Sequence, residues 1–125
     1  MVSDDVVTYN FAEVEGFSSF GSYTGNGSAD GPFIYTGFRP AFVLVKSSSA
    51  ATSWFIMDSK RDPYNYVKQR LSPDLSQAET TDSALFDYTA NGFKLRYAGG
   101  AINTTGATYI YMAFAEMPFK YSVGR

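Results

Sequence analysis

The segment NGFKLRY, residues 91–97, restricts the possible folds more than any other part of the chain. Its apolar side chains alternate with Lys94 and Arg96, and a period of two places apolar residues on one face of a β-strand. The pair Asn91-Gly92 tolerates positive φ angles and separates this run from another apolar run at 84–88. We therefore predict a half-buried antiparallel strand that belongs to a hairpin.

Similar short runs recur along the 125 residues, and they are rich in aromatic and β-branched side chains. The chain has 11 Phe and 10 Tyr, and its 11 Gly suit the tight turns that many short strands need. The predicted strands are 6–13, 17–24, 33–38, 41–46, 53–58, 84–88, 93–97 and 108–116. This pattern predicts an all-β fold, an antiparallel β-sandwich that is jelly-roll-like.

Two segments depart from the alternating pattern. The last predicted strand, TYIYMAFAE at 108–116, is apolar on both faces, so we expect either a central strand covered on both sides or an outer face that meets another subunit. Residues 59–83 contain two prolines and little periodicity. They predict one long surface loop, with a helical turn near 74–78, and a loop of that length is usually functional or disordered.

Composition excludes several kinds of chemistry. The chain has no Cys and no His, which excludes a thiol nucleophile, a Ser-His-Asp triad and an ordinary zinc site. Its net charge is −2, and no basic cluster suggests nucleic acid, while no apolar run is long enough for membrane insertion. Asn26, Ser28 and Asp30 are spaced like the start of a calcium loop, but the later bidentate Glu is missing. We expect no metal and no cofactor.

A short motif occurs near both ends of the chain, as FAEVEGF at 11–17 and FAEMPF at 114–119. The separation is too long for a propeller blade and is close to the length of one domain. One interpretation is a complete repeat unit preceded by the tail of another. The other is that two strands of one sandwich share a similar aromatic pattern.

From about residue 8 to residue 119 the chain resembles repeated domains at the distal, C-terminal end of tail fibre proteins of tailed bacteriophages. The resemblance rests on FAEVEGFSSFGSYTGNGSADGPFIYTGFRPAFVLVK, WFIMDSKRD, NGFKLR and TYIYMAFAEMPF. It implies that 1–16 is an N-terminal strand resembling the end of a preceding repeat and that 17–125 is the sandwich domain. It also implies a virion location in the tail fibre, a homotrimer, contacts with other tail proteins and a bacterial surface receptor.

If the domain binds a receptor, we expect the contacts to lie on loops that a rigid sandwich supports. The predicted ligand-binding residues lie together after the strand at 53–58. Tyrosine rings stack on sugar rings, and the polar side chains bind hydroxyls or carboxylates. These residues are Arg61, Asp62, Tyr64, Asn65 and Tyr66. The alternative is an ordered surface loop whose tyrosines pack on the sheet or on a neighbouring subunit. For Trp54, the single tryptophan, we expect a core or interface position.

The leading functional hypothesis is therefore a non-enzymatic receptor-binding or fibre-tip domain that recognises a bacterial surface glycan or protein. A second hypothesis is a purely structural spacer or decoration domain of the virion. A third is a polysaccharide depolymerase, which needs two carboxylates at a defined separation across a cleft. The carboxylates near predicted strand ends are Asp58, Asp62, Asp87 and Glu116.

Overall fold

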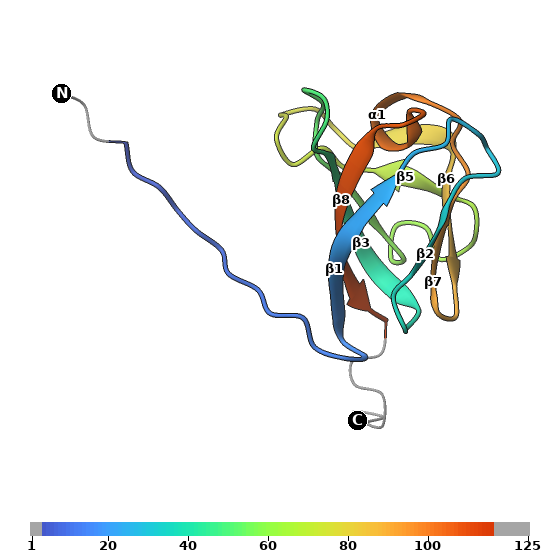
Figure 1. Cartoon of the computed structure of the whole chain (residues 1–125), viewed down its shortest axis with the longest axis horizontal. Helices are drawn as coiled ribbons and strands as arrows, with labels where there is room; N and C mark the ends of the chain where they lie inside the picture. The colour runs from blue at the N-terminus through green and yellow to red at the C-terminus, as the bar shows by residue number, and fades with distance from the viewer. Residues whose placement is uncertain (1–3, 117–125) are drawn as a thin grey trace.

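The computed structural model describes residues 4–116, which form two four-stranded antiparallel sheets packed face to face (Figure 1). The strands are β1 (Ser18–Thr24), β2 (Phe33–Tyr35), β3 (Pro40–Ser47), β4 (Phe55–Asp58), β5 (Val67–Arg70), β6 (Thr80–Thr89), β7 (Gly92–Leu95) and β8 (Thr108–Ala115). One short helix, α1 (Gly100–Asn103), precedes β8. The predicted all-β sandwich is confirmed.

The first sheet has the strand order β1-β8-β3-β4, and the second has the order β2-β7-β6-β5. The chain changes sheet four times, between β1 and β2, between β2 and β3, between β4 and β5 and between β7 and β8, so the first and last strands lie in the same sheet. β8 lies between β1 and β3 within its sheet, but it is not covered on both faces, because Ile110 is 43% exposed; the alternative, an outer face that meets another subunit, stays a prediction. Within the described part of the chain, no helix is long and apolar enough to cross a bilayer.

The core lies between the two sheets and follows from the alternation of each strand. Val43 and Val45 of β3 and Phe93 and Leu95 of β7 are all completely buried, while the residues between them are only partly buried. The ring of Tyr23 stacks on that of Tyr109 in this layer, with centroids 5.1 Å apart. The two apolar faces therefore shield each other from water, which is the main stabilisation of a sandwich.

The predicted hairpin connects β6 and β7, but its turn is shifted by one residue. Thr89 pairs with Gly92, so Ala90 and Asn91 form the two-residue loop. Gly92 is instead the first residue of β7, and it pairs with Tyr35 of the neighbouring strand β2. A Cβ atom there would lie 2.1 Å from the carbonyl oxygen of Ile34, so close backbone approach explains this glycine.

The long loop predicted over 59–83 is wrong in its extent. Residues 67–70 form β5, and β6 begins at Thr80. Val67 is completely buried and pairs with Phe86, so one apolar side chain and a partner strand suffice to create this element. The helical turn expected near 74–78 is not formed, and the only helix of the described residues is α1.

The strand expected at 6–13 is also absent. Residues 4–13 run away from the sandwich as an extended arm, and no strand of the described chain pairs with them (Figure 1). Phe11 reaches back, with ring centroids 6.4 Å from Phe20 and 6.0 Å from Phe114, and the backbone oxygen of Ala12 accepts a hydrogen bond from Ser18 Oγ at 3.2 Å. The motif at 114–119 is described only to Glu116, so its comparison with 11–17 is limited to the first three residues.

Candidate recognition surface and cavity

The loop between β4 and β5 contains all five predicted ligand-binding residues, and three of them hold its shape. The carboxylate of Asp62 accepts hydrogen bonds from the backbone N–H groups of Lys68 and Gln69, both at 2.6 Å. Arg61 donates to Asp58 at 2.7 Å and to Glu79 at 2.6 Å. These contacts fix the loop to the ends of β4, β5 and β6.

Asn65 extends the pairing of β5 with β6 by a side chain. Its amide nitrogen donates to the backbone oxygen of Tyr88 at 2.9 Å, and its amide oxygen accepts from the backbone N–H of Tyr88 at 2.9 Å. The side chain thus replaces the peptide group of a neighbouring strand. Asp62 and Asn65 are therefore positioning residues, a role that the sequence pattern did not distinguish from ligand contact.

The two tyrosines of the loop remain available. Tyr64 is 82% exposed and Tyr66 is 51% exposed, although hydrogen bonds hold the loop that carries them against the sheet. Aromatic rings of this kind supply large contact area with few rotatable bonds. The alternative in which both rings pack down on the sheet of their own chain is not what the structure shows.

Tyr66 continues into the outer face of the second sheet. Since Val67 pairs with Phe86, the antiparallel register places Tyr66 beside Asp87. Asp87 pairs with Lys94, and Lys94 pairs with Phe33. We call Tyr66, Asp87, Lys94 and Phe33 the cross-strand row; it carries an exposed aromatic ring at each end and two charged groups between them.

The charges of this row are paired with neighbours. Asp87 accepts from Arg96 Nε at 2.5 Å, and this hydrogen bond raises the pKa of the Arg96 guanidinium. Lys94 Nζ lies 2.8 Å from Asp30, whose pKa it lowers by hydrogen bonding and by charge. The second carboxylate oxygen of Asp87 is buried and has no hydrogen-bond partner. Between its two rings the row thus carries one cation, Lys94, and the carboxylate of Asp87, of which one oxygen binds Arg96 and the other is buried.

Sequence reasoning missed the contribution of β2 to this surface. Phe33 and Tyr35 are 47% and 68% exposed, while Ile34 between them is buried. The alternation in FIY was the available signal, but only the register shows that both rings share a face with Lys94. Trp54 is 38% exposed, so the expected core position is wrong, whereas an interface position stays a prediction.

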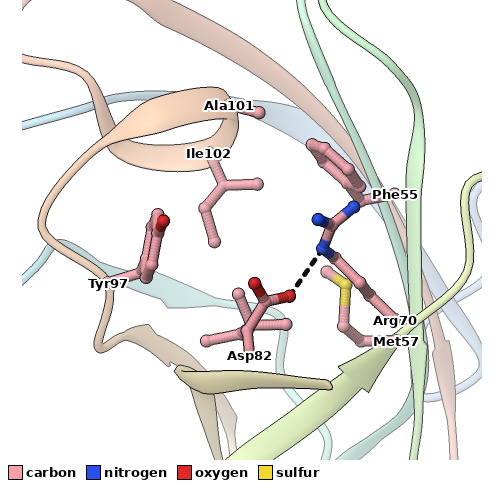
Figure 2. A pocket seen from close by; sticks show the side chains of 8 residues that line it. Phe55, Met57, Arg70, Asp82, Tyr97, Ala101 and Ile102 are labelled. Atoms are coloured by element: carbon pink, nitrogen blue, oxygen red, sulfur yellow. Dashed lines mark hydrogen bonds and ion pairs between the residues drawn. The ribbon is translucent and has the colours of Figure 1, made fainter. Parts of the chain in front are cut away.

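A separate cavity of about 170 Å³ opens between the sheets, beside α1 (Figure 2). Its wall is mostly apolar and comes from β4, β5, β6, α1 and the segment after β7. The lining residues are Phe55, Met57, Arg70, Asp82, Leu85, Tyr97, Ala101 and Ile102. Sequence reasoning missed this cavity, because Arg70 and Asp82 lie in the segment predicted to be a loop.

The cavity contains one ion pair. Arg70 Nε lies 2.5 Å from a carboxylate oxygen of Asp82, and the guanidinium carbon lies 4.5 Å from the centroid of the Phe55 ring. Arg70 also donates to Ser72 Oγ at 3.3 Å. The arginine is therefore held in one orientation by a carboxylate, a hydroxyl and an aromatic face.

The four carboxylates considered for a depolymerase each have a local partner. Asp58 binds Arg61 and two backbone N–H groups, and Glu116 lies 3.2 Å from Arg39. Asp62 and Asp87 have the contacts given above. Among residues 4–116, no cluster of three or more acidic side chains could hold a metal ion. Asn26 and Ser28 instead accept hydrogen bonds from backbone N–H groups within their own turn.

Residues 1–118 match a protein family described as a domain of unknown function, DUF7483, and the chain belongs to this family. Comparison with curated proteins and with solved structures finds no match.

Proposed function

We propose that this DUF7483 domain is a non-enzymatic receptor-binding domain at the tip of a bacteriophage tail fibre, where it recognises a bacterial surface glycan or protein. The observation that carries the proposal is that the loop between β4 and β5 is held by hydrogen bonds of Asp62 and Asn65 while it exposes Tyr64 and Tyr66. The resemblance to distal tail fibre domains supplies the biological setting. The proposed location is the virion, and the proposed partners are the receptor and other tail proteins.

The geometry supports recognition for an energetic reason. Binding costs free energy when side chains and loops must be ordered, and a loop already held by Asp62 and Asn65 has less freedom to lose. Tyr66 and Phe33 offer apolar ring surface at the two ends of the cross-strand row, and the partly exposed ammonium group of Lys94 between them can donate to hydroxyls or carboxylates. Several copies in a trimer would convert weak single sites into strong attachment.

The experiment is binding of the fluorescently labelled chain to a panel of bacterial strains, measured by flow cytometry. We expect the double variant Tyr64→Ala/Tyr66→Ala to bind a responding strain at least tenfold more weakly, because two exposed aromatic contacts are lost. Tyr9→Ala is the matched control, since Tyr9 is 80% exposed but lies on the extended arm. Equal binding by the wild type and the double variant would overturn the assignment of the loop.

A second candidate function, the structural spacer or decoration domain, is favoured by the outer face of the first sheet. This apolar face consists of Phe20, Phe42, Leu44, Ile56, Ile110, Met112 and Phe114, all at least partly exposed. The ring of Phe114 lies 5.8 Å from that of Phe42 and 6.0 Å from that of Phe20. A contiguous apolar surface of this kind is typical of a contact between subunits.

Light scattering of the purified chain tests this candidate. Ile110 is 43% exposed at one end of the face, beside Ser22 and Lys46, so Ile110→Lys should convert a trimer into monomers if the face is the contact. The two candidates then differ in the accessibility of the loop. Rapid surface labelling of Tyr64 and Tyr66 in the trimer supports recognition, whereas protection of both supports a structural role.

A further inference from the structure

We propose that the cavity beside α1 binds one neutral pyranose ring that carries a methyl-bearing substituent, such as an N-acetyl or 6-deoxy group. The inference rests on the proposed function, because it names the class of glycan that a receptor would offer. The cavity lies between the sheets and is distinct from the Tyr64–Tyr66 loop. It would serve as a pocket for one sugar unit of a longer chain.

The size of the cavity sets the size of the ligand. Pockets for drug-sized molecules usually enclose about 300 to 1,000 Å³, whereas an apolar cavity of about 150 Å³ accommodates benzene. The volume of about 170 Å³ therefore admits a single six-membered ring. The lining residues Arg70 and Asp82 are 22% and 19% exposed, and Tyr97 and Ala101 are partly exposed, so the cavity is open to solvent and the rest of a glycan can extend outward.

The apolar wall determines which part of the ring enters. Leu85 and Ile102, each 3% exposed, reach the cavity with only small parts of their methyl groups and carbon chains, and Met57 has no exposed surface. Placing an ionised substituent against such a wall without a partner would be costly. A methyl group or the C–H face of a sugar would instead gain from leaving water.

The ion pair determines the polar side of the ligand. Arg70 and Asp82 neutralise each other, so the pair has no net charge to attract an ionised sugar. A guanidinium has five N–H donors and a carboxylate has about four acceptor positions, so one mutual bond leaves donors and acceptors side by side. Two adjacent sugar hydroxyls, each able to donate and accept, complement that arrangement.

An aromatic ring completes the site. Tyr97 is half-buried and lies across the cavity from Phe55 and Arg70 (Figure 2). Aromatic faces pack well against flat apolar surfaces, and the C–H face of a pyranose is such a surface. The pocket thus provides a stacking face, an apolar wall and a neutral pair of polar groups for the same ring.

The test is a methyl NMR titration of the whole chain with two probes, N-acetylglucosamine and L-rhamnose. We expect saturable shifts of the Met57, Leu85 and Ile102 methyl resonances in the millimolar range of sugar concentration, as is usual for single weak sites of small polar ligands. Met112 lies on the outer face of the first sheet and serves as the internal control. The absence of shifts at the cavity methyls with both sugars would overturn the inference, as would equal shifts at Met112.

Two variants link the shifts to the cavity. Ala101→Leu adds apolar volume to the lining, and we expect it to weaken sugar binding at least tenfold while the melting temperature stays equal or rises. Asp82→Asn should also weaken binding, because the carboxylate acceptor is lost. Glu116→Gln, in an ion pair outside the cavity, is the matched control and should bind like the wild type. Unchanged binding by Ala101→Leu would overturn the inference.

The outcomes separate the inference from the proposed function. Loss of cell binding in Tyr64→Ala/Tyr66→Ala, without any sugar-dependent methyl shift, would retain the receptor-binding function and overturn the cavity site. Methyl shifts that Ala101→Leu abolishes, without binding to any bacterial strain, would support the sugar site and overturn the receptor role.

Discussion

Replacing Asn65 with Ala tests whether the Asn65 side chain, by its hydrogen bonds to the backbone of β6, holds the loop between β4 and β5 in place. The wild-type amide makes two hydrogen bonds of 2.9 Å with the backbone of Tyr88, which is itself buried. An intramolecular hydrogen bond contributes about 1 kcal/mol net, so losing both should cost about 2 kcal/mol of unfolding free energy. For a chain of this length the melting temperature should fall by roughly 8 °C.

The assay is urea unfolding followed by Trp54 fluorescence, combined with binding to a responding bacterial strain. We expect Asn65→Ala to lower both the unfolding midpoint and the binding, since the loop that carries Tyr66 loses its anchor. Asn65→Asp sharpens the test, because an ionised carboxylate accepts from the Tyr88 N–H but cannot donate to the Tyr88 carbonyl.

That variant also predicts a pH dependence with a definite sign. Protonation restores a donor, so the carboxyl introduced at position 65 should have a raised pKa in the folded state, and its protonated form should be the stabilising one. The stability deficit of Asn65→Asp relative to the wild type should therefore shrink as the pH falls through about 4. An unfolding free energy for Asn65→Ala within about 0.5 kcal/mol of the wild-type value, as at an ordinary surface site, would refute this explanation of how the loop is held.

Three further predictions concern the scaffold. Asn103→Ala should cost about 2 to 4 kcal/mol in urea unfolding, because its fully buried amide bonds three backbone groups, and a loss under 1 kcal/mol would contradict this. Burial raises the pKa of Tyr23 and Tyr88 in the folded state. The free energy of unfolding should therefore keep its full value below the unfolded-state tyrosine pKa of about 10 and fall as the pH rises above it. Replacing both residues by Phe should make this fall at alkaline pH less steep. Gly31→Ala should cost about 1 to 3 kcal/mol, since a Cβ atom there lies 2.5 Å from the Leu95 Cβ atom, whereas Gly99→Ala, with open space around it, should be nearly neutral in thermal unfolding.

The sequence predicted strands such as β7 that bury alternate side chains, but it missed β5 and predicted a strand at 6–13 that is absent. In β7, Phe93 and Leu95 alternate with Lys94, which is a sufficient local signal. In β5 only Val67 is buried, and the other three residues are polar, so its existence depends on pairing with β6 rather than on local pattern. Tertiary pairing of this kind overrides weak β-propensity.

The candidate site was predictable in position but not in roles. The composition of residues 61–66 identified a loop with aromatic and polar groups, but which groups face solvent depends on the backbone of β6, to which Asn65 binds. The Arg70–Asp82 ion pair of the cavity could not be predicted from the sequence. It forms because β5 pairs antiparallel with β6, and both residues lie in the segment that was predicted to be a loop.

The central claim is recognition by the loop that carries Tyr64 and Tyr66. Its most direct test is an equilibrium titration of the wild type and of Tyr64→Ala/Tyr66→Ala against surface polysaccharide purified from a strain that the chain binds. We predict saturable binding by the wild type and at least tenfold weaker binding by the variant, with unchanged thermal stability. Equal affinity of the two proteins would contradict the claim.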